Sequence, residues 1–344
     1  MTTRPVRVAA PPAAPALPGA RGGLSAAVIA ALRGARRPLP GDLSGADPWG
    51  DDLQLALYLL YELHYRGFAD VADRHEWDPE LLRLRAAAED RFLTALRREV
   101  APGDDVGGAL GGLLLEPVTD DGNSISHFLQ REGTWWQMRE YTVLRSPYHL
   151  KEADPHVWVV PRLRGRAKAA MVAVEYDEYG AGRAEAVHAE LFAALMRDLG
   201  LDSSYGRYLD AAPAPALATV NLMSLLGLHR ALRGALVGHF ATVEVTSSPG
   251  SRRMAAALRR LGAGPDAVRF HDEHVEADAV HEQVVRHEVV GGLLEDEPEL
   301  AADVVFGIRA TTHLEERLAR WTLAAWRAGR SALRRPLEPV PPER

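Results

Sequence analysis

Beyond about Gly41, apolar residues recur at the three- and four-residue spacing of amphipathic helices along almost the whole chain. Leu53, Leu57 and Leu60 show this spacing in the first such segment. Strictly alternating runs of the strand type are scarce. The pattern therefore predicts an all-α protein, a bundle whose longer helices cover residues 163–179, 184–199, 217–245, 267–290 and 302–328.

Turn-forming residues divide this pattern into an N-terminal part and a larger remainder. Asp78 followed by Pro79 is typical of a helix start, and we expect the helix that begins there to end before Pro102. The glycine-rich stretch 103–112 is a candidate boundary. We therefore expect a disordered tail over residues 1–40, a helical extension over 41–104, a main domain over 105–330 and a second disordered tail over 331–344.

Composition and charge exclude several classes of function. An apolar content of 47% is enough for a buried core, and the absence of cysteine excludes disulfides, thiolate zinc sites and iron–sulfur clusters. The formal charge of -7 is spread along the chain, which argues against a nucleic-acid partner. No apolar run is long enough to span a membrane, and the N-terminus lacks the apolar core of a signal peptide. We therefore expect a cytoplasmic protein without membrane or nucleic-acid partners, in which any metal is held by His, Asp and Glu.

One predicted helix places three metal-ligating side chains on a single face. His274, Asp278 and His281 stand at positions i, i+4 and i+7, so on a helix they fall within about 60° of one another. Two other interpretations stay open. The segment is charged throughout and also suits a solvated helix face, and His271, one turn earlier, is a competing ligand.

A second cluster precedes this helix in the chain. Glu185 and His188 form the Glu-x-x-His pair that di-iron carboxylate bundles project inward from a core helix. Glu178 lies seven residues before Glu185, on the same face if the helix is continuous, although Gly180 and Gly182 between them favour a break. The pair alone is weak evidence because a charged chain supplies it by chance, and Glu178 also suits a solvated turn.

Together the two clusters predict a site with two metal ions. Three histidines and three carboxylates on two long helices are costly to bury without a cation. With one further carboxylate the ligands would carry four negative charges, and carboxylates about 4 Å apart repel by roughly 4 kcal/mol at an effective dielectric constant of about 20. Two divalent cations would cancel that charge.

With these motifs, residues from about 103 to 328 resemble the haem-oxygenase-like di-iron oxidases, a family of iron-containing redox enzymes. The family pattern is a Glu on a first helix, then Glu-x-x-His, then His-x3-Asp-x2-His, and the last two elements match here residue for residue. By order and spacing the first Glu is Glu152, with Glu140, His149 and Asp154 as neighbouring alternatives. The resemblance implies a haem-oxygenase-like helical bundle with an N-terminal helical extension.

The resemblance also implies which residues hold the metals. Members that oxygenate nitrogen carry an additional Glu seven residues before the Glu-x-x-His pair, which is the position of Glu178 here. Glu178 and Glu185 are the carboxylates expected to act in catalysis, with Glu185 as a candidate bridge between the metals. One iron would be held by Glu152, His188 and His281, and the other by Glu185, His274 and Asp278.

The activity implied by the resemblance is that of an O2-dependent di-iron oxidase or oxygenase with two Fe(II)/Fe(III) ions as cofactors. O2 would be the co-substrate, reduced to a peroxo-diferric species, and an electron-donor protein or a small reductant would regenerate the site. Glu178 favours N-oxygenation of a small amine, amino acid or guanidine. The alternatives are oxidative C–C fragmentation or desaturation, and ferritin-like iron storage without an organic substrate. Because the N-terminal extension resembles the dimer-forming part of some members, we expect a homodimer.

Other polar residues on predicted helices are candidates for the substrate pocket. Glu244 and His239 could face the substrate, although a core or capping role suits them better. Asn221, His229 and Arg230 could position a substrate carboxylate, and buried structural hydrogen bonds explain them equally well.

Overall fold

The computed structural model describes residues 14–35, 38–115 and 122–338, with side chains for all of these except residues 276–280. All the regular secondary structure in these residues is helical. None of the helices that it describes is both long and apolar enough to span a bilayer. The all-α expectation is confirmed.

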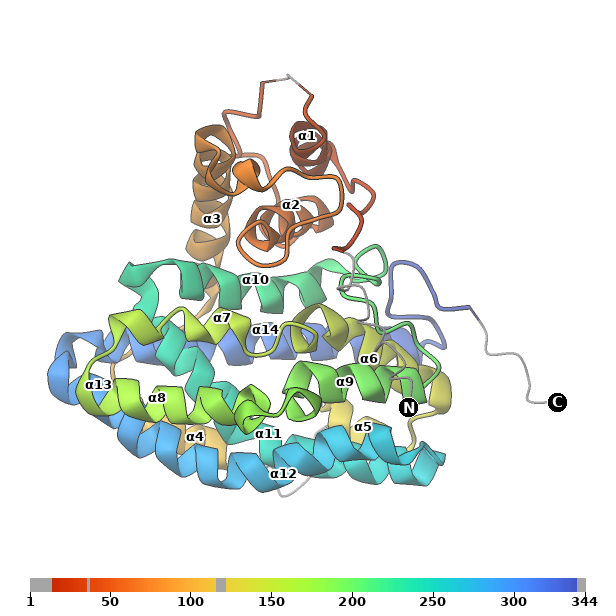
Figure 1. Cartoon of the computed structure of the whole chain (residues 1–344), viewed down its shortest axis with the longest axis vertical. Coiled ribbons are helices and arrows are strands. Elements are labelled where there is room, and N and C mark those ends of the chain that lie inside the picture. Colours follow the sequence, from red (N-terminus) through yellow and green to blue (C-terminus); the bar gives the residue numbers. More distant parts are fainter. Residues whose placement is uncertain (1–13, 36–37, 116–121, 339–344) are drawn as a thin grey trace, which may run out of the picture.

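Three helices form a unit at the N-terminal end of the molecule (Figure 1). Here called the N-terminal unit, it contains α1 (Gly23–Leu32), α2 (Asp51–Glu62) and α3 (Pro79–Glu99). The start of α3 is capped as predicted, because Oδ1 of Asp78 accepts hydrogen bonds from the backbone N–H groups of Glu80 (2.9 Å) and Leu81 (3.4 Å). The unit rests on the bundle through contacts between α2 and α10.

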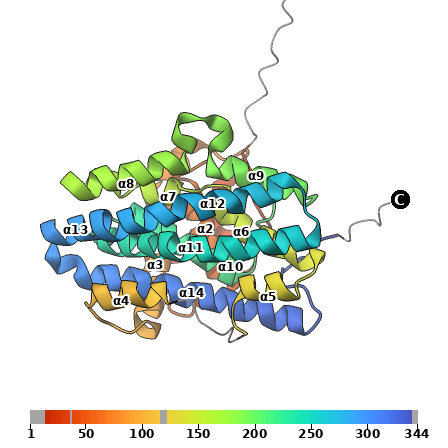
Figure 2. The ribbon, with the colours of Figure 1, turned by 90° about the horizontal axis from the view of Figure 1, so that it is seen from below.

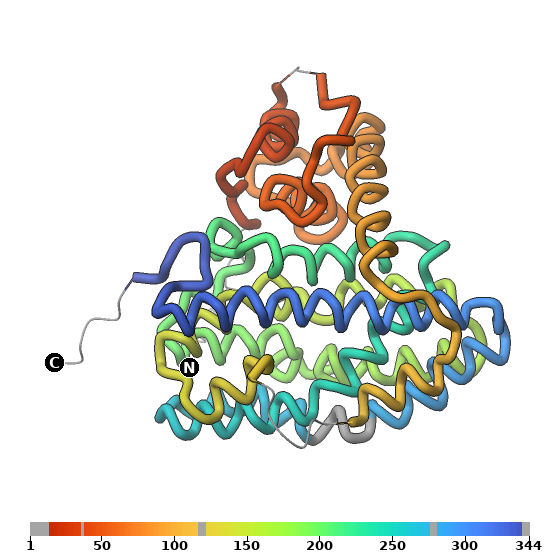
Figure 3. The backbone as a smooth tube through the Cα atoms, turned by 180° about the vertical axis from the view of Figure 1, so that it is seen from behind, coloured from red at the N-terminus to blue at the C-terminus, as the bar shows by residue number. Residues whose placement is uncertain are grey.

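The remaining helices form a layered bundle. α11 lies at its centre, between α12 on one side and α14 on the other (Figure 2). α8 and α9 form an outer layer on α12, and α4 and α5 cover α14 and α11 from the opposite side. Seen from behind, α3 leads from the N-terminal unit down to α4 (Figure 3). The bundle helices are α4 (Val106–Leu114), α5 (Ile125–Arg131), α6 (Trp135–His149), α7 (Asp154–Val157), α8 (Gly165–Glu178), α9 (His188–Asp198), α10 (Ala214–Leu228), α11 (Arg233–Leu261), α12 (Pro265–Val284), α13 (Gly291–Asp296) and α14 (Ala301–Arg327).

The close crossing of α11 and α14 depends on two glycines. A Cβ atom on Gly238 would overlap the backbone carbonyl group of Val304, and a Cβ atom on Gly307 would overlap that of Ala235. Each helix therefore presents a glycine to the backbone of the other. Because backbone atoms cannot move aside as the end of a side chain can, these glycines set how closely the central helix packs against α14.

The segment between α8 and α9 differs from the predicted helix over residues 184–199. α8 ends at Glu178, and residues 180–182 follow with positive φ angles of 75°, 51° and 82°. A Cβ atom on Gly180 would lie 2.6 Å from the backbone nitrogen of Val187, so only glycine allows the chain to fold back this closely. Residues 184–186 form a separate 3-10 turn, and α9 begins at His188. The expectation that Glu185 and His188 share one helix is therefore wrong.

Both segments expected to be disordered tails contain folded parts. Residues 23–32, within the first of them, form α1, whose Val28 and Leu32 are buried. At the other end, Ala332 and Leu333 are buried, and the backbone N–H of Ala332 donates to Oε2 of Glu140 (2.9 Å). A few apolar side chains fold each segment onto the protein. Residues 1–13 and 339–344 lie outside the described part of the chain.

Three other boundaries also differ from those predicted. Residues 217–245 belong to two helices, α10 and α11, because the chain is extended at His229 (φ -101°, ψ 111°). Residues 267–290 form α12 and a following π-helical segment, Val285–Val290. The glycine-rich stretch expected as a boundary holds the start of α4, which packs on α14 and α11. Helical periodicity located these segments, but it did not resolve where one helix gives way to the next.

Replacing Gly307 with Ala should destabilise the protein. We expect a loss of about 1–3 kcal/mol in the free energy of unfolding, because the added methyl group must push the two helices apart. Gly111→Ala in α4 is the matched control, since a Cβ atom at Gly111 meets no heavy atom within 4 Å. Urea unfolding of both variants makes the comparison, and equal stability of the two would contradict the packing described for α11 and α14.

Candidate metal centre

Six buried side chains with metal-ligating atoms gather where α8, α9, α11 and α12 meet. They form two sets of three, and within each set one ligand atom from every residue lies within 4.8 Å of the others. We call the two sets group one and group two. Group one is Glu152, His188 and His274, and group two is Glu178, Glu244 and His281.

The ends of secondary-structure elements supply half of these residues. Glu178 is the last residue of α8 and His188 is the first of α9, so the tight glycine turn between the two helices brings them together. Glu152 lies in the turn between α6 and α7. His274 and His281 are two turns apart on one face of α12, which lets a single helix serve both groups.

In group one, neighbouring atoms orient the ligand side chains. Nδ1 of His274 donates a hydrogen bond to the backbone carbonyl of Phe270 (2.7 Å). Its Nε2 therefore carries the lone pair in the neutral ring, and this atom lies 4.0 Å from Oε1 of Glu152. The other oxygen of Glu152 lies 2.9 Å from Nδ1 of His149. A histidine fixed by a backbone carbonyl and a carboxylate fixed by an imidazole are typical surroundings of metal ligands.

In group two, carboxylates surround one imidazole ring. Nδ1 of His281 lies 3.2 Å from Oε2 of Glu244 and 3.8 Å from Oε1 of Glu178. Its Nε2 lies 3.2 Å from Oδ2 of Asp177. Glu178 also joins the two groups, since its Oε2 is 2.7 Å from Nδ1 of His188. The groups are therefore contiguous, and one carboxylate reaches both.

The charges in the site perturb its titration. Burial opposes the charge on His281, yet hydrogen bonding to Glu244 and Asp177 and the charge of Glu178 raise its pKa to about 9. Burial likewise opposes the charge on His188, but the adjacent Glu178 raises its pKa. Burial would raise the pKa of Glu152, but the two histidines beside it hold that pKa well below its usual value. At neutral pH a protonated His281 therefore balances part of the carboxylate charge in the metal-free protein.

A further buried carboxyl, Glu175, lies one turn before Glu178 on α8. Its side chain is buried, and neither carboxyl oxygen has a hydrogen-bond partner among the described residues. Burial and the charges of Glu178 and Glu244 raise the pKa of Glu175 well above its usual value. Such a group stays protonated next to the site unless positive charge is added.

This donor set suits two adjoining divalent cations. Three imidazoles and three carboxylates are the ligands of non-haem iron, and all six side chains are buried. Burying three carboxylates together is costly unless cations or protons compensate, and the raised pKa of His281 is the response expected of an imidazole placed among carboxylates. A metal ion would replace the proton of that imidazole.

The structure brings together five of the seven residues predicted to bind metal, and it groups them differently. His281 lies with Glu178 rather than with Glu152 and His188. His274, expected with Glu185 and Asp278, instead lies with Glu152 and His188, where His281 was expected. Glu185 is exposed in the 3-10 turn and belongs to neither group, so its assignment rests on the family pattern alone. The side chain of Asp278 lies outside the described residues, and its role stays a prediction.

Glu244 is the ligand candidate that the sequence motifs missed. It is buried on α11, which carries none of the His-rich motifs. The only signal was a single acidic residue in a largely apolar stretch, which suited a core or capping role better than a substrate-facing one. Among the alternatives to Glu152, Oε2 of Glu140 accepts a hydrogen bond from Nε1 of Trp326 (2.9 Å), and Asp154 accepts one from Tyr179 (3.0 Å), so both are engaged outside the two groups.

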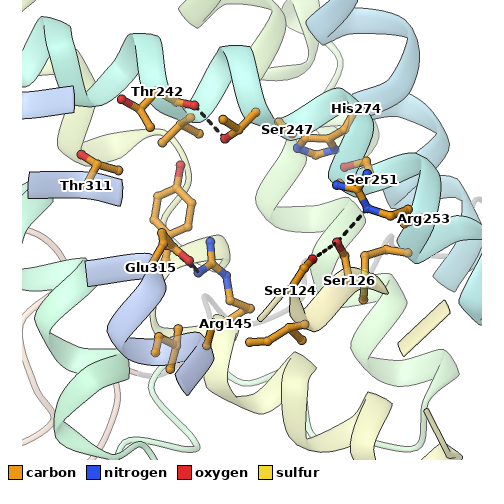
Figure 4. A pocket seen from close by; sticks show the side chains of 18 of the residues that line it. Ser124, Ser126, Arg145, Thr242, Ser247, Ser251, Arg253, His274, Thr311 and Glu315 are labelled. Atoms are coloured by element: carbon orange, nitrogen blue, oxygen red, sulfur yellow. Dashed lines mark hydrogen bonds and ion pairs between the residues drawn. The ribbon is translucent and has the colours of Figure 1, made fainter. Parts of the chain in front are cut away.

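A cavity of about 510 Å³ leads to the two groups. Glu152, Glu178, Glu244 and His274 line it, so both groups contribute to its wall. Figure 4 shows part of this wall, with His274 of group one on one side of the space. Arg145 and Glu315 form an ion pair on another side, and Thr242 and Ser247 lie across the space from it. His239 does not line the cavity but lies behind Thr311, with its Nδ1 2.8 Å from the threonine hydroxyl.

Two other pocket candidates from the sequence, Asn221 and His229, have structural roles. Asn221 donates through Nδ2 to the backbone carbonyl and the side-chain oxygen of Gln54 (2.8 Å each), and so joins α10 to α2. His229 lies 3.0 Å from Oε2 of Glu89 on α3. The structural explanation is confirmed for Asn221 and His229, whereas Arg230 is exposed and does not line the cavity.

Metal binding should release protons, because a metal ion displaces the proton that His281 holds up to a pH of about 9. Calorimetric titration of the metal-free protein at pH 7 with Co(II) or anaerobic Fe(II), in buffers of different ionisation enthalpy, counts these protons. We expect at least one released per chain. Metal affinity should rise with pH up to about 9, and binding without proton release would contradict this account of group two.

Glu175→Gln should stabilise the metal-free protein above the ordinary pKa of a carboxyl. Because folding raises the pKa of Glu175, the unfolded chain ionises first, and the folded state loses stability as pH rises toward the folded pKa. The variant escapes this loss, so its advantage in melting temperature should be small near pH 4 and larger at pH 7. A constant difference across this range would show that the Glu175 carboxyl is not responsible.

The part of the chain that contains both groups resembles known redox proteins. Residues 139–316, just over half of the chain, match a family described as an iron-containing redox enzyme. A nitrosourea synthase from Streptomyces achromogenes subsp. streptozoticus is 27% identical over 157 residues, which make up 46% of this chain. The chain covers only 33% of that relative, so the similarity concerns a part of it. The fold, the buried donor set and the extent of the match together show that this chain belongs to the family of iron-containing redox enzymes.

Proposed function

We propose that this protein is an O2-dependent non-haem di-iron oxygenase that oxidises the nitrogen of a small amine, amino acid or guanidine. The observation that carries the proposal is the pair of contiguous metal-ligating groups on the wall of a single cavity. A substrate bound in this cavity would lie beside both metals at once. A storage protein has no need of such a cavity, which favours the oxygenase over ferritin-like iron storage.

In this proposal the residues of group one hold one iron and those of group two hold the other. Glu178 reaches His188 of group one as well as His281 of its own group, so it is the natural carboxylate to lie between the metals. Two irons bound there would supply the binding and reduction of O2. Asp278 and Glu185, which the family pattern adds, stay predicted ligands.

Residues around the groups would keep the ligands in place and handle protons. His149 holds the carboxylate of Glu152, and the carbonyl of Phe270 fixes the tautomer of His274. Asp177 holds Nε2 of His281. Neither carboxyl oxygen of Glu175 has a hydrogen-bond partner in the described chain, and its raised pKa favours the protonated form one turn from Glu178, so it is a candidate to donate a proton during O2 reduction.

Two observations favour nitrogen over carbon as the oxidised atom. Glu178, the extra carboxylate implied by the resemblance to N-oxygenating members, lies within group two and is buried. The Streptomyces relative described above is itself named a nitrosourea synthase. Oxidative C–C fragmentation or desaturation by the same groups is the alternative chemistry.

The cavity suits a small polar substrate better than a long hydrocarbon chain. Eight serine and threonine residues line it. Nη1 of Arg145 donates to both carboxylate oxygens of Glu315 (2.8 and 3.0 Å), and both side chains face the cavity. A paired guanidinium and carboxylate can receive the carboxylate and the ammonium group of an amino acid. We further propose an external reductant and a homodimer formed through the N-terminal unit.

The test is O2 consumption by the anaerobically iron-loaded protein, with candidate amines, amino acids and guanidines followed by mass spectrometry using isotopically labelled O2. We expect a substrate of this class to accelerate O2 consumption and to gain an oxygen atom from O2 on nitrogen. His281→Ala should reduce iron affinity by about 10–100-fold or more, and O2 consumption with it. Glu190→Ala, an exposed carboxylate on α9, is the control and should behave like the wild type.

Three results would contradict the proposal. If the wild type bound fewer than two irons per chain, a di-iron site would be excluded. Fragmentation of the carbon skeleton would support the alternative chemistry. Repeated oxidation of added Fe(II) without any effect of organic substrates would support iron storage.

A further inference from the structure

Lys151 is an unusual residue to find next to a metal ligand. It directly precedes Glu152, and its side chain is only 1% exposed. Its Nζ lies 2.6 Å from Oε2 of Glu62, which is fully buried. Glu62 is the last residue of α2, so this ion pair connects the N-terminal unit with the turn that carries Glu152.

Tyrosines enclose this ion pair. The hydroxyl of Tyr205 donates to the Glu62 carboxylate, at 2.8 Å from both oxygens. The ammonium group of Lys151 lies 4.8 Å from the ring centroid of Tyr58 and 4.4 Å from that of Tyr65, close enough for cation–π contacts. Both charges are therefore paired, and the geometry of the pair is fixed by bulky neighbours.

The turn that carries Glu152 is held on its other side as well. Oδ1 of Asp154 accepts a hydrogen bond from the hydroxyl of Tyr179 (3.0 Å), and Tyr179 directly follows Glu178 of group two. The two residues that flank the Glu152–Ala153 dipeptide are thus tied to different parts of the molecule. Lys151 ties the turn to the N-terminal unit, and Asp154 ties it to the end of α8.

We propose that Lys151 and Glu62 are positioning residues that hold Glu152 in group one, so that the N-terminal unit completes the metal site. This inference rests on the proposed function, in which Glu152 binds metal. Lys151 and Glu152 are adjacent in one turn, so the backbone angles at Lys151 limit the position of the Glu152 backbone. When the Lys151 side chain is held in the N-terminal unit, the direction in which Glu152 leaves the backbone is set as well.

The test compares metal binding and stability in two single variants, Glu62→Gln and Lys151→Met, by Co(II) titration followed through its visible absorption. We expect one of the two metal ions to bind about 10–100-fold more weakly in each variant, while the other binds as in the wild type. Glu89→Gln is the matched control. Glu89 is buried in the same unit and also joins it to the bundle, through His229 (3.0 Å), but it does not touch the turn at Glu152.

The double variant Glu62→Leu with Lys151→Met keeps the proposal testable if a single variant fails to fold. It leaves no unpaired buried charge, so the fold should be retained, and it removes the ion pair that connects the turn to the N-terminal unit. Loss of one metal site in the folded double variant, with both sites intact in Glu89→Gln, supports the inference. Wild-type affinity for two metals in a variant lacking the pair overturns it. Failure of the wild type to bind two metals would instead overturn the proposed function.

Discussion

The contact between Glu178 and His188 is the interaction on which the rest of the site depends. It joins two groups of ligands, each of which would otherwise be an isolated cluster, at a distance of 2.7 Å. Both residues stand at helix ends, and both are buried. Their burial brings three carboxylates and three imidazoles into one small volume, and such a volume is stable only if cations or protons balance its charge.

The architecture meets this requirement by combining rigid helices with a tight turn. Reciprocal glycine contacts hold α11, which carries Glu244, against α14. α12 contributes one histidine to each group, and the glycine turn after α8 brings Glu178 to His188. The turn at Glu152 is tied both to the N-terminal unit and to the end of α8. Ligands from five separate segments therefore converge without a continuous helix joining Glu178 to His188.

Periodicity alone was sufficient to predict the class of fold and the stripe of His274 and His281 on α12. Gly180 and Gly182 predicted a break between the two helices, but not that the break extends to residue 187, because its extent depends on how closely Gly180 approaches Val187 in three dimensions. The pairing of ligands between the groups depends on helix packing, which spacing does not encode. Glu244 was missed for the same reason. A lone acidic residue in an apolar helix can be recognised as a ligand candidate only when the position of that helix beside the other ligands is known. Residue types thus predicted which kinds of side chain the site contains, and tertiary contacts determined which of these side chains lie together.

Membership of the iron-containing redox enzymes agrees with the chemistry of the donor set. The central claim is that the two contiguous groups bind two iron ions side by side. Anomalous X-ray scattering at the iron edge, from crystals of anaerobically reconstituted protein, tests it directly. The account predicts two neighbouring peaks, one against Glu152, His188 and His274 and the other against Glu178, Glu244 and His281. A single peak, or peaks that lie away from either group, would contradict it.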